Sequence, residues 1–292
     1  MTGTPLAKRR AALRAGAALA LAAALPARAQ AAPRLVTLGG PITEAVYLLG
    51  AQDLLVGTDT TSTYPDAAQR TPKVGYFRQL SAEGLLALEP TAIVANAEAG
   101  PPLVLEQLRG AGVRVDVVPV THDWAEVQAK LAAVGRATGR EAAAREVQAR
   151  LDADWQAAQA EVANALARQP RRPRALFILG HGTSPSVAGA GTGADALIRL
   201  IGCDNAMQGY RGYRAMTAEG MAQAAPDVLL TTTEGIAAQG GIERLWARPG
   251  MALVPAYAAR RLVARDALEM MGFGPRLPQT VRALHRAVVR GA

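Results

Sequence analysis

Residues 75–84 read Gly75-Tyr-Phe-Arg-Gln-Leu-Ser-Ala-Glu-Gly84, and residues 212–220 read Gly212-Tyr-Arg-Ala-Met-Thr-Ala-Glu-Gly220. In both copies a proline follows the glutamate by seven residues, and a strand-like apolar run follows the proline. Ser81 and Thr217 are good helix N-caps, and an acid in the first turn suits the helix dipole. Two copies at matched spacing predict two related α/β lobes.

Two apolar runs, 34–38 and 175–179, end in glycine-rich turns, Gly39-Gly40 and Gly180-His181-Gly182. Both runs are typical of buried strands, and strands that alternate with helices predict parallel sheets flanked by helices. Ligands bind outside the carboxyl ends of such strands. We therefore expect Gly39, Gly40 and His181 to face each other across a cleft between the lobes.

Residues 141–168 contain no glycine or proline and are rich in Ala, Gln, Glu and Arg. This composition predicts one helix of about 28 residues, ~42 Å long, which Pro170 and Pro173 end. The predicted organisation is therefore an N-terminal lobe over 32–140, a connecting helix over 141–169 and a C-terminal lobe over 170–292. A single rigid helix between the lobes limits hinge motion.

Residues 1–31 have the form of a cleaved signal peptide. Lys8, Arg9, Arg10 and Arg14 precede an apolar run over 15–25, which is too short to span a membrane and leads to small-x-small cleavage sites. Arg9-Arg10 is a partial twin-arginine signal with alanine where phenylalanine is usual, so the Sec and twin-arginine routes both stay open.

Charge and cysteine usage narrow the class of protein. Removal of residues 1–31 takes away five positive charges and lowers the net charge from +8 to +3, which argues against nucleic-acid binding. Cys203 is the single cysteine, so an internal disulfide cannot form. Because no cysteine lies at the cleavage site for lipid attachment, the sequence favours a periplasm as the compartment.

Two more motifs read Asp59-Thr-Thr-Ser-Thr-Tyr-Pro65 and Gly272-Phe-Gly-Pro-Arg276. From about Arg34 onward the chain resembles the helical-backbone class of periplasmic binding proteins, and these motifs, with 75–84, look like its haem-transporting branch. The resemblance implies a monomeric carrier, not an enzyme. It would take up one or two haems supplied from an outer-membrane receptor and deliver them to an ABC permease and its ATPase.

Tyr76 is the first candidate for an axial ligand of haem iron. Ferric iron is a hard acid, and phenolate is one of the ligands that proteins use for it. A nearby cation favours the ionised phenol, and in an extended segment Arg78 points to the same side. The haem-branch resemblance assigns the same roles to both residues.

Tyr64 is the competing tyrosine. Asp66, two residues on, opposes ionisation of the phenol, and Pro65 indicates a turn in which Tyr64 only walls the pocket. A third interpretation makes both tyrosines half-buried loop residues without a metal role.

His181 lies between glycines at a predicted strand end, and imidazole is a common haem ligand. Some members of the haem branch are similar in having histidine here. His181 then ligates the same iron, or the iron of a second, stacked haem, or neither. For His122 and His285 we expect structural or merely exposed roles.

The second copy of the repeat supplies Tyr213, which we expect to stack on the porphyrin or bond a propionate. Arg211 and Arg214 flank it, and arginine binds carboxylates bidentately. The sequence is equally consistent with exposed, solvated side chains for both arginines.

Glu83 and Glu219 occupy matching positions in the two copies. In the class that the chain resembles, one exposed glutamate on each lobe docks to arginines of the permease. Favourable interaction with the helix dipole explains the same positions, and the two roles are compatible.

Enzyme motifs are weak or absent. Gly189–Gly193 lacks the lysine of a phosphate-binding loop, and neither a nucleophile elbow nor His-Glu-x-x-His occurs. The alternatives to a haem carrier are the same fold carrying cobalamin, a ferric siderophore or iron, and a periplasmic enzyme or metal-sensing adaptor.

Overall fold

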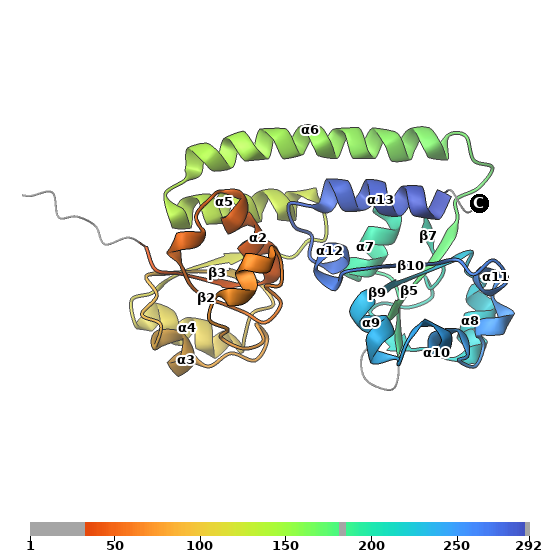
Figure 1. Cartoon of the computed structure of the whole chain (residues 1–292), viewed down its shortest axis with the longest axis horizontal. Helices are drawn as coiled ribbons and strands as arrows, with labels where there is room; N and C mark the ends of the chain where they lie inside the picture. Colours follow the sequence, from red (N-terminus) through yellow and green to blue (C-terminus); the bar gives the residue numbers. More distant parts are fainter. Residues whose placement is uncertain (1–32, 181–184, 290–292) are drawn as a thin grey trace, which may run out of the picture. The chain divides into compact units, whose positions relative to one another are not determined.

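The computed structural model describes residues 33–180 and 185–289, which belong to one compact unit, Pro33–Ala292. The predicted signal peptide lies outside the described residues. Two sheets with flanking helices form two lobes, and one long helix runs across both (Figure 1). The predicted class, two α/β lobes joined by one helix, is confirmed. Within 33–180 and 185–289 no helix is long and apolar enough to cross a membrane.

The sheet of the N-lobe has the order β2-β1-β3-β4, and all neighbouring strands are parallel, as predicted. Leu35 packs on one face of β1 while Val36 and Leu38 pack on the other, so this strand is covered on both sides. The strands are β1 (Leu35–Leu38), β2 (Leu55–Thr58), β3 (Ala92–Asn96) and β4 (Arg114–Val118). The helices are α2 (Gly40–Leu48), α3 (Ala82–Leu86), α4 (Pro102–Gly110) and α5 (Trp124–Thr138).

The sheet of the C-lobe has the order β10-β9-β5-β6-β8, with β7 paired to β5. Its strands are β5 (Arg174–Leu179), β6 (Ser186–Ala188), β7 (Asp204–Asn205), β8 (Tyr213–Ala215), β9 (Val228–Thr232) and β10 (Leu262–Arg265). Its helices are α7 (Gly193–Leu200), α8 (Ala218–Ala224), α9 (Thr233–Ala238), α10 (Ile242–Trp246), α11 (Pro255–Ala258), α12 (Ala267–Met271) and α13 (Leu277–Val289).

The expectation of parallel strands is wrong at one edge of this second sheet. β6 is antiparallel to β5, and β8 is antiparallel to β6. Only six residues separate β5 from β6, which is too short for the crossover that a parallel pair requires.

The repeated motif forms the same local structure twice. The Ser81 hydroxyl accepts a hydrogen bond from Gly84 N at 3.4 Å at the start of α3, and the Thr217 hydroxyl accepts one from Gly220 N at 3.1 Å at the start of α8. Strands β3 and β9 follow where the apolar runs predict them. The copies differ at their tyrosines, because Tyr76 lies in a turn and Tyr213 opens strand β8.

The long connecting helix is α6 (Glu141–Leu166), which ends two residues before the predicted Arg168. One apolar stripe along it enters both cores. Its first half faces α5 and its second half faces α13 (Figure 1). Ala144, Val147 and Leu151 pack into the N-lobe core, and Trp155, Ala158 and Val162 pack into the C-lobe core.

Trp124, the first residue of α5, fixes the middle of α6. Its ring stacks on Trp155 at 5.2 Å between centroids and 8° between planes. Its indole nitrogen donates to Asp152 at 2.6 Å. Hydrogen bonds from Trp124 and two glutamines hold the pKa of Asp152 below its ordinary value although burial raises it.

A buried lysine ties the two lobes together below α6. Lys130 on α5 is 1% exposed, and its Nζ donates to Glu126 at 2.6 Å and to the carbonyls of Gly272 and Phe273 at 2.7 and 2.9 Å. Burial lowers the pKa of Lys130, whereas Glu126 opposes that shift. A second inter-lobe contact is the ion pair that joins Glu44 of α2 to Arg276 at 3.0 Å.

We expect Lys130→Met to destabilise the protein by about 3–5 kcal/mol, because it leaves the Glu126 carboxylate buried without its cation. Urea unfolding of the mature protein measures this change. The matched control is Glu161→Gln, which breaks an exposed ion pair with Arg286 and should leave the unfolding midpoint nearly unchanged. Equal midpoints for the two variants would refute the role of Lys130.

Candidate ligand-binding site

A cavity of about 850 Å³ lies between the two lobes. The carboxyl ends of strands from both sheets surround it, as the parallel order predicts. Gly39 and Gly40 line it, which confirms their expected place. Residues at or just after strand ends also line it: Asn96, His122, Leu179, Gly180, Thr232 and Asp266.

Tyr76, Arg78 and Glu98 form a hydrogen-bonded chain in the N-lobe wall of this cavity. The Arg78 guanidinium donates both to the Tyr76 hydroxyl and to the Glu98 carboxylate. It also lies 4.6 Å from the centre of the Phe77 ring. Burial alone lowers the pKa of Arg78, but the bond to Tyr76 and the charge of Glu98 raise it above its ordinary value.

Backbone hydrogen bonds hold this chain of side chains in place. Gln79 N donates to Tyr76 O at 2.8 Å, so a tight turn and not an extended segment brings Arg78 back to Tyr76. Gly100 N donates to Phe77 O at 2.9 Å, which ties the turn to the loop that carries Glu98.

The motif over 59–65 shapes the neighbouring part of the N-lobe wall, at the start of α2, and Thr60 N donates to Gly75 O at 3.0 Å. The Asp59 side chain is fully buried and accepts from Gly39 N at 2.9 Å and from the Thr61 hydroxyl at 2.6 Å. The same loop packs so closely that a Cβ on Gly40 would lie 2.4 Å from Thr61 O. Asp59 therefore has a structural role, and the close packing of this wall leaves room only for glycine at position 40.

Tyr213 enters the cavity from the C-lobe, next to Gly191, Thr192 and Gly193. Burial raises the pKa of its phenol, and hydrogen bonding by Thr192 opposes the shift. The charges of Glu98 and Arg78 also act on it, so the structure brings the tyrosines of both repeats to one cavity.

Tyr64 is not among the described residues that line the cavity. Its ring is 43% exposed and lies against the guanidinium of Arg276, 3.9 Å from the ring centre. Arg276 in turn donates to Glu44 at 3.0 Å. Two of the motifs, 59–65 and 272–276, thus meet in one stack beside the inter-lobe ion pair.

The two arginines that flank Tyr213 lie outside the cavity lining. Arg211 is exposed, and its guanidinium packs against the backbone of Gly191, which does line the cavity. Arg214 points to another surface pocket, where it stacks at 4.3 Å on the ring of Tyr210.

His122 is a cavity residue that the sequence analysis missed. It has φ of 55°, its ring lies 5.3 Å from that of Phe273, and its backbone N donates to Glu126 at 2.7 Å. The strand-end argument that found Gly39 applies equally to His122, which follows β4. His285, by contrast, is buried and bonds Ile201 O at 2.9 Å, in keeping with a structural role.

His181 lies outside the described residues, so its expected role stays a prediction. Met271 lines the cavity, whereas Met270 is buried in the C-lobe core. Within 33–180 and 185–289 no group of three or more His, Cys, Asp or Glu residues is placed to hold a metal ion. Glu98, like His122, belongs to the site but was not expected from the sequence.

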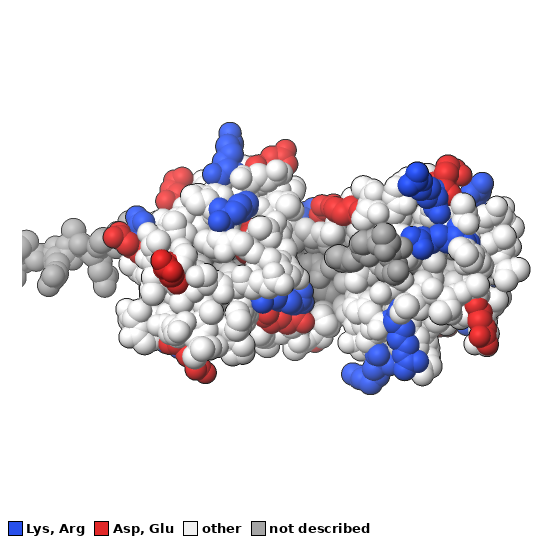
Figure 2. Space-filling view, turned by 90° about the horizontal axis from the view of Figure 1, so that it is seen from below, with Lys and Arg blue, Asp and Glu red and all other residues white. Residues whose placement is uncertain are grey.

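Glu83 and Glu219 occupy equivalent exposed positions in the first turns of α3 and α8. The face opposite α6 carries small, separate groups of acidic and basic side chains, and other residues form most of it (Figure 2). Both carboxylates are accessible for contact with another protein.

Two α/β lobes that enclose a ligand-sized cavity below one rigid helix define a substrate-binding protein of the helical-backbone class. Comparison with known families agrees, since residues 35–267 match the family described as "Periplasmic binding protein". The chain belongs to this family.

Three relatives sharpen the comparison. The solved structure of periplasmic heme-binding protein BhuT in complex with two hemes is 48% identical, with a TM-score of 0.84 over 89% of this chain and 99% of that chain. The ABC transporter substrate-binding lipoprotein YvrC of Bacillus subtilis is 26% identical over 87% of this chain and 79% of its own. The vitamin B12-binding protein of Yersinia pestis is 34% identical, but over 36% of this chain and 38% of its own length.

We expect Gly40→Ala to destabilise the protein by about 1–3 kcal/mol, because the new methyl group collides with backbone that side-chain rotation cannot move. Gly84→Ala is the matched control, since its nearest neighbour would be 3.9 Å away and alanine favours the helix by about 0.5–1 kcal/mol. Thermal unfolding of both variants measures the difference. A loss of stability as large in Gly84→Ala would show that the close contact at Gly40 is not the cause.

Proposed function

We propose that this protein captures haem in the periplasm and delivers it to an ABC importer. The likeness to BhuT over nearly the whole mature chain supports haem as the ligand. The likeness to an ABC transporter substrate-binding protein supports a permease and its ATPase as partners. An outer-membrane receptor would supply the haem, and the protein would act as a monomer after export by the Sec or twin-arginine route.

The Tyr76–Arg78 pair in the cavity wall carries the proposal. Tyr76 is 36% exposed and lines the cavity, so a flat ligand can approach its phenol. A guanidinium hydrogen bond stabilises negative charge on that oxygen, and phenolate binds ferric iron. Tyr76 is therefore the proposed axial ligand, with Arg78 as its partner.

The remaining cavity suits a flat, largely apolar ligand. Phe77, Leu268 and Met271 supply apolar contact, and a thioether packs well on an aromatic face. Tyr213 would stack on the porphyrin or bond a propionate. Arg211, which packs against Gly191 of the cavity lining, would pair with a propionate, whereas Arg214 points to the other pocket. Tyr64 would contribute only beside Arg276, at the edge of the site.

A second haem is part of the proposal. BhuT holds two hemes, and His181 follows Gly180, which lines this cavity. His181 would ligate the iron of the first haem or of a second haem stacked on it. A stoichiometry near two in solution would support the second arrangement.

The alternative ligand is cobalamin, or a ferric siderophore in the same fold. The vitamin B12-binding relative favours it, yet that similarity covers about a third of the chain. The family and the solved structure are binding proteins, so we propose a carrier that performs no turnover.

We expect hemin to bind the purified mature protein with a saturable Soret change and a ferric phenolate charge-transfer band. Tyr76→Phe should lose the band and weaken binding at least about tenfold, because it removes the ligand oxygen. Tyr64→Phe is the matched control and should titrate like the wild type. Without a saturable change in the wild type, cobalamin and siderophores become the candidates. Retention of the band in Tyr76→Phe would exclude Tyr76 as the ligand.

The docking role of the two exposed glutamates generates a second test. We expect Glu83→Ala/Glu219→Ala to abolish haem transport into proteoliposomes that contain the permease and ATPase, with hemin affinity unchanged. Glu146→Ala, an exposed change on α6, is the control and should transport normally. Loss of hemin binding in the double variant would refute the docking assignment.

A further inference from the structure

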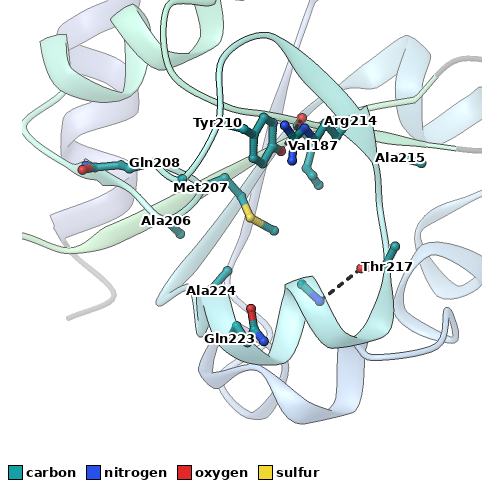
Figure 3. A pocket seen from close by; sticks show the side chains of 12 residues that line it. Val187, Ala206, Met207, Gln208, Tyr210, Arg214, Ala215, Thr217, Gln223 and Ala224 are labelled. Atoms are coloured by element: carbon teal, nitrogen blue, oxygen red, sulfur yellow. Dashed lines mark hydrogen bonds between the residues drawn. The ribbon is translucent and has the colours of Figure 1, made fainter.

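A second pocket, of about 430 Å³, lies in the C-lobe between β8, α8 and the loop before β8 (Figure 3). Met207 extends into it toward α8, and Tyr210 with Arg214 forms the wall across from the helix (Figure 3). The pocket shares no lining residue with the inter-lobe cavity. It is therefore separate from the proposed haem site.

The walls of this pocket are fixed by packing. The Tyr210 ring lies against the backbone of Gly189, where a Cβ would come within 2.5 Å of the ring. The Arg214 guanidinium lies 4.3 Å from the centre of the same ring. Val187, beside Tyr210, and Ala224, on α8, are buried and add apolar surface to the lining. Such a preformed hollow binds without a large ordering cost.

The hydroxyl groups at this pocket are already used. The Tyr210 hydroxyl donates to Val187 O at 3.0 Å, and the Thr217 hydroxyl accepts from Gly220 N at 3.1 Å (Figure 3). A polar metabolite needs several fixed polar groups to orient it. Here both hydroxyls are taken, and the Arg214 guanidinium lies over the Tyr210 ring. The adaptable thioether of Met207 and the apolar floor fit an apolar side chain better.

The pocket opens beside a carboxylate that faces solvent. Gln223 lines the pocket and donates to Glu219 at 3.4 Å, one turn away on α8. Next to α8 packs the short turn Met251–Leu253, whose Leu253 is 66% exposed. The apolar pocket and the negative charge of Glu219 thus lie side by side. This surface is complementary to a partner segment that carries an apolar side chain next to a basic one.

We propose that this pocket receives an apolar side chain from a periplasmic segment of the ABC permease, while a basic residue of the same segment pairs with Glu219. The proposal rests on the proposed function, because the permease is the partner. The proposed contact would anchor the C-lobe to the permease by burying apolar surface. Glu219 alone supplies only an exposed ion pair, and exposed ion pairs contribute little binding energy by themselves. Buried anchors in fitted pockets carry most of the binding energy of protein interfaces.

The test measures association of the haem-loaded protein with the cognate permease and ATPase in nanodiscs, by surface plasmon resonance. Gln223→Trp fills the pocket from an exposed lining position on α8, and we expect it to weaken association at least about tenfold. Met207→Ala removes the adaptable thioether from the pocket and should weaken association about fivefold. Ala142→Trp places the same bulk on α6 and should leave association unchanged.

Hemin titration and thermal unfolding of each variant separate this inference from the proposed function. Normal hemin binding and folding with weakened association supports the pocket as a permease contact. Wild-type association in both pocket variants overturns the inference and leaves haem carriage standing. Failure of the wild-type protein to associate with the permease overturns the inference together with the permease partnership, and failure to bind hemin is a separate refutation of the haem proposal.

Discussion

Helix α6 is shared by two hydrophobic cores, and the rest of the structure depends on that sharing. Ala144 and Leu151 are buried in one core and Ala158 and Val162 in the other, along one stripe of a continuous helix. A hinge would have to break the helix or expose part of the stripe, and each buried aliphatic side chain is worth about 1.5–3 kcal/mol. The cavity below α6 is therefore largely preformed.

Short-range rules predicted the elements of this fold well. The two capped helices, the strands that follow them and the start of α6 depend on residues close in sequence, so a pattern within about ten residues contains the information. The antiparallel strands β6 and β8 depend instead on loop length and on the partners left free at a sheet edge. The hydrogen bonds of Lys130 depend on the carbonyls of Gly272 and Phe273, which lie far away in the sequence and which local sequence patterns cannot indicate.

The site shows the same division. The spacing of Tyr76 and Arg78 in the sequence predicted that their side chains lie together. They do, but a turn and not an extended segment brings them together. Glu98 was missed because a loop contact between distant residues brings it to Arg78. His122 was missed although it follows β4, where the strand-end argument applies. Asp59, by contrast, belongs to a motif that looked functional, yet its hydrogen bonds support the wall at Gly39. A motif can thus mark a binding site even when its side chains only fix the backbone that forms the wall of the site.

Helix α13 completes the C-lobe core. Leu277, Val281, Leu284 and Val288 pack with Trp155 and Val162 of α6, so the last helix closes a core that begins at the middle of the chain. The N-lobe sheet and its helices, by contrast, are complete by Thr138. During synthesis the first lobe is complete once the first half of α6 has emerged, while the second keeps apolar surface exposed until residues 277–288 emerge. Loss of the C-terminal helix would therefore be a defect of folding before it is a defect of binding.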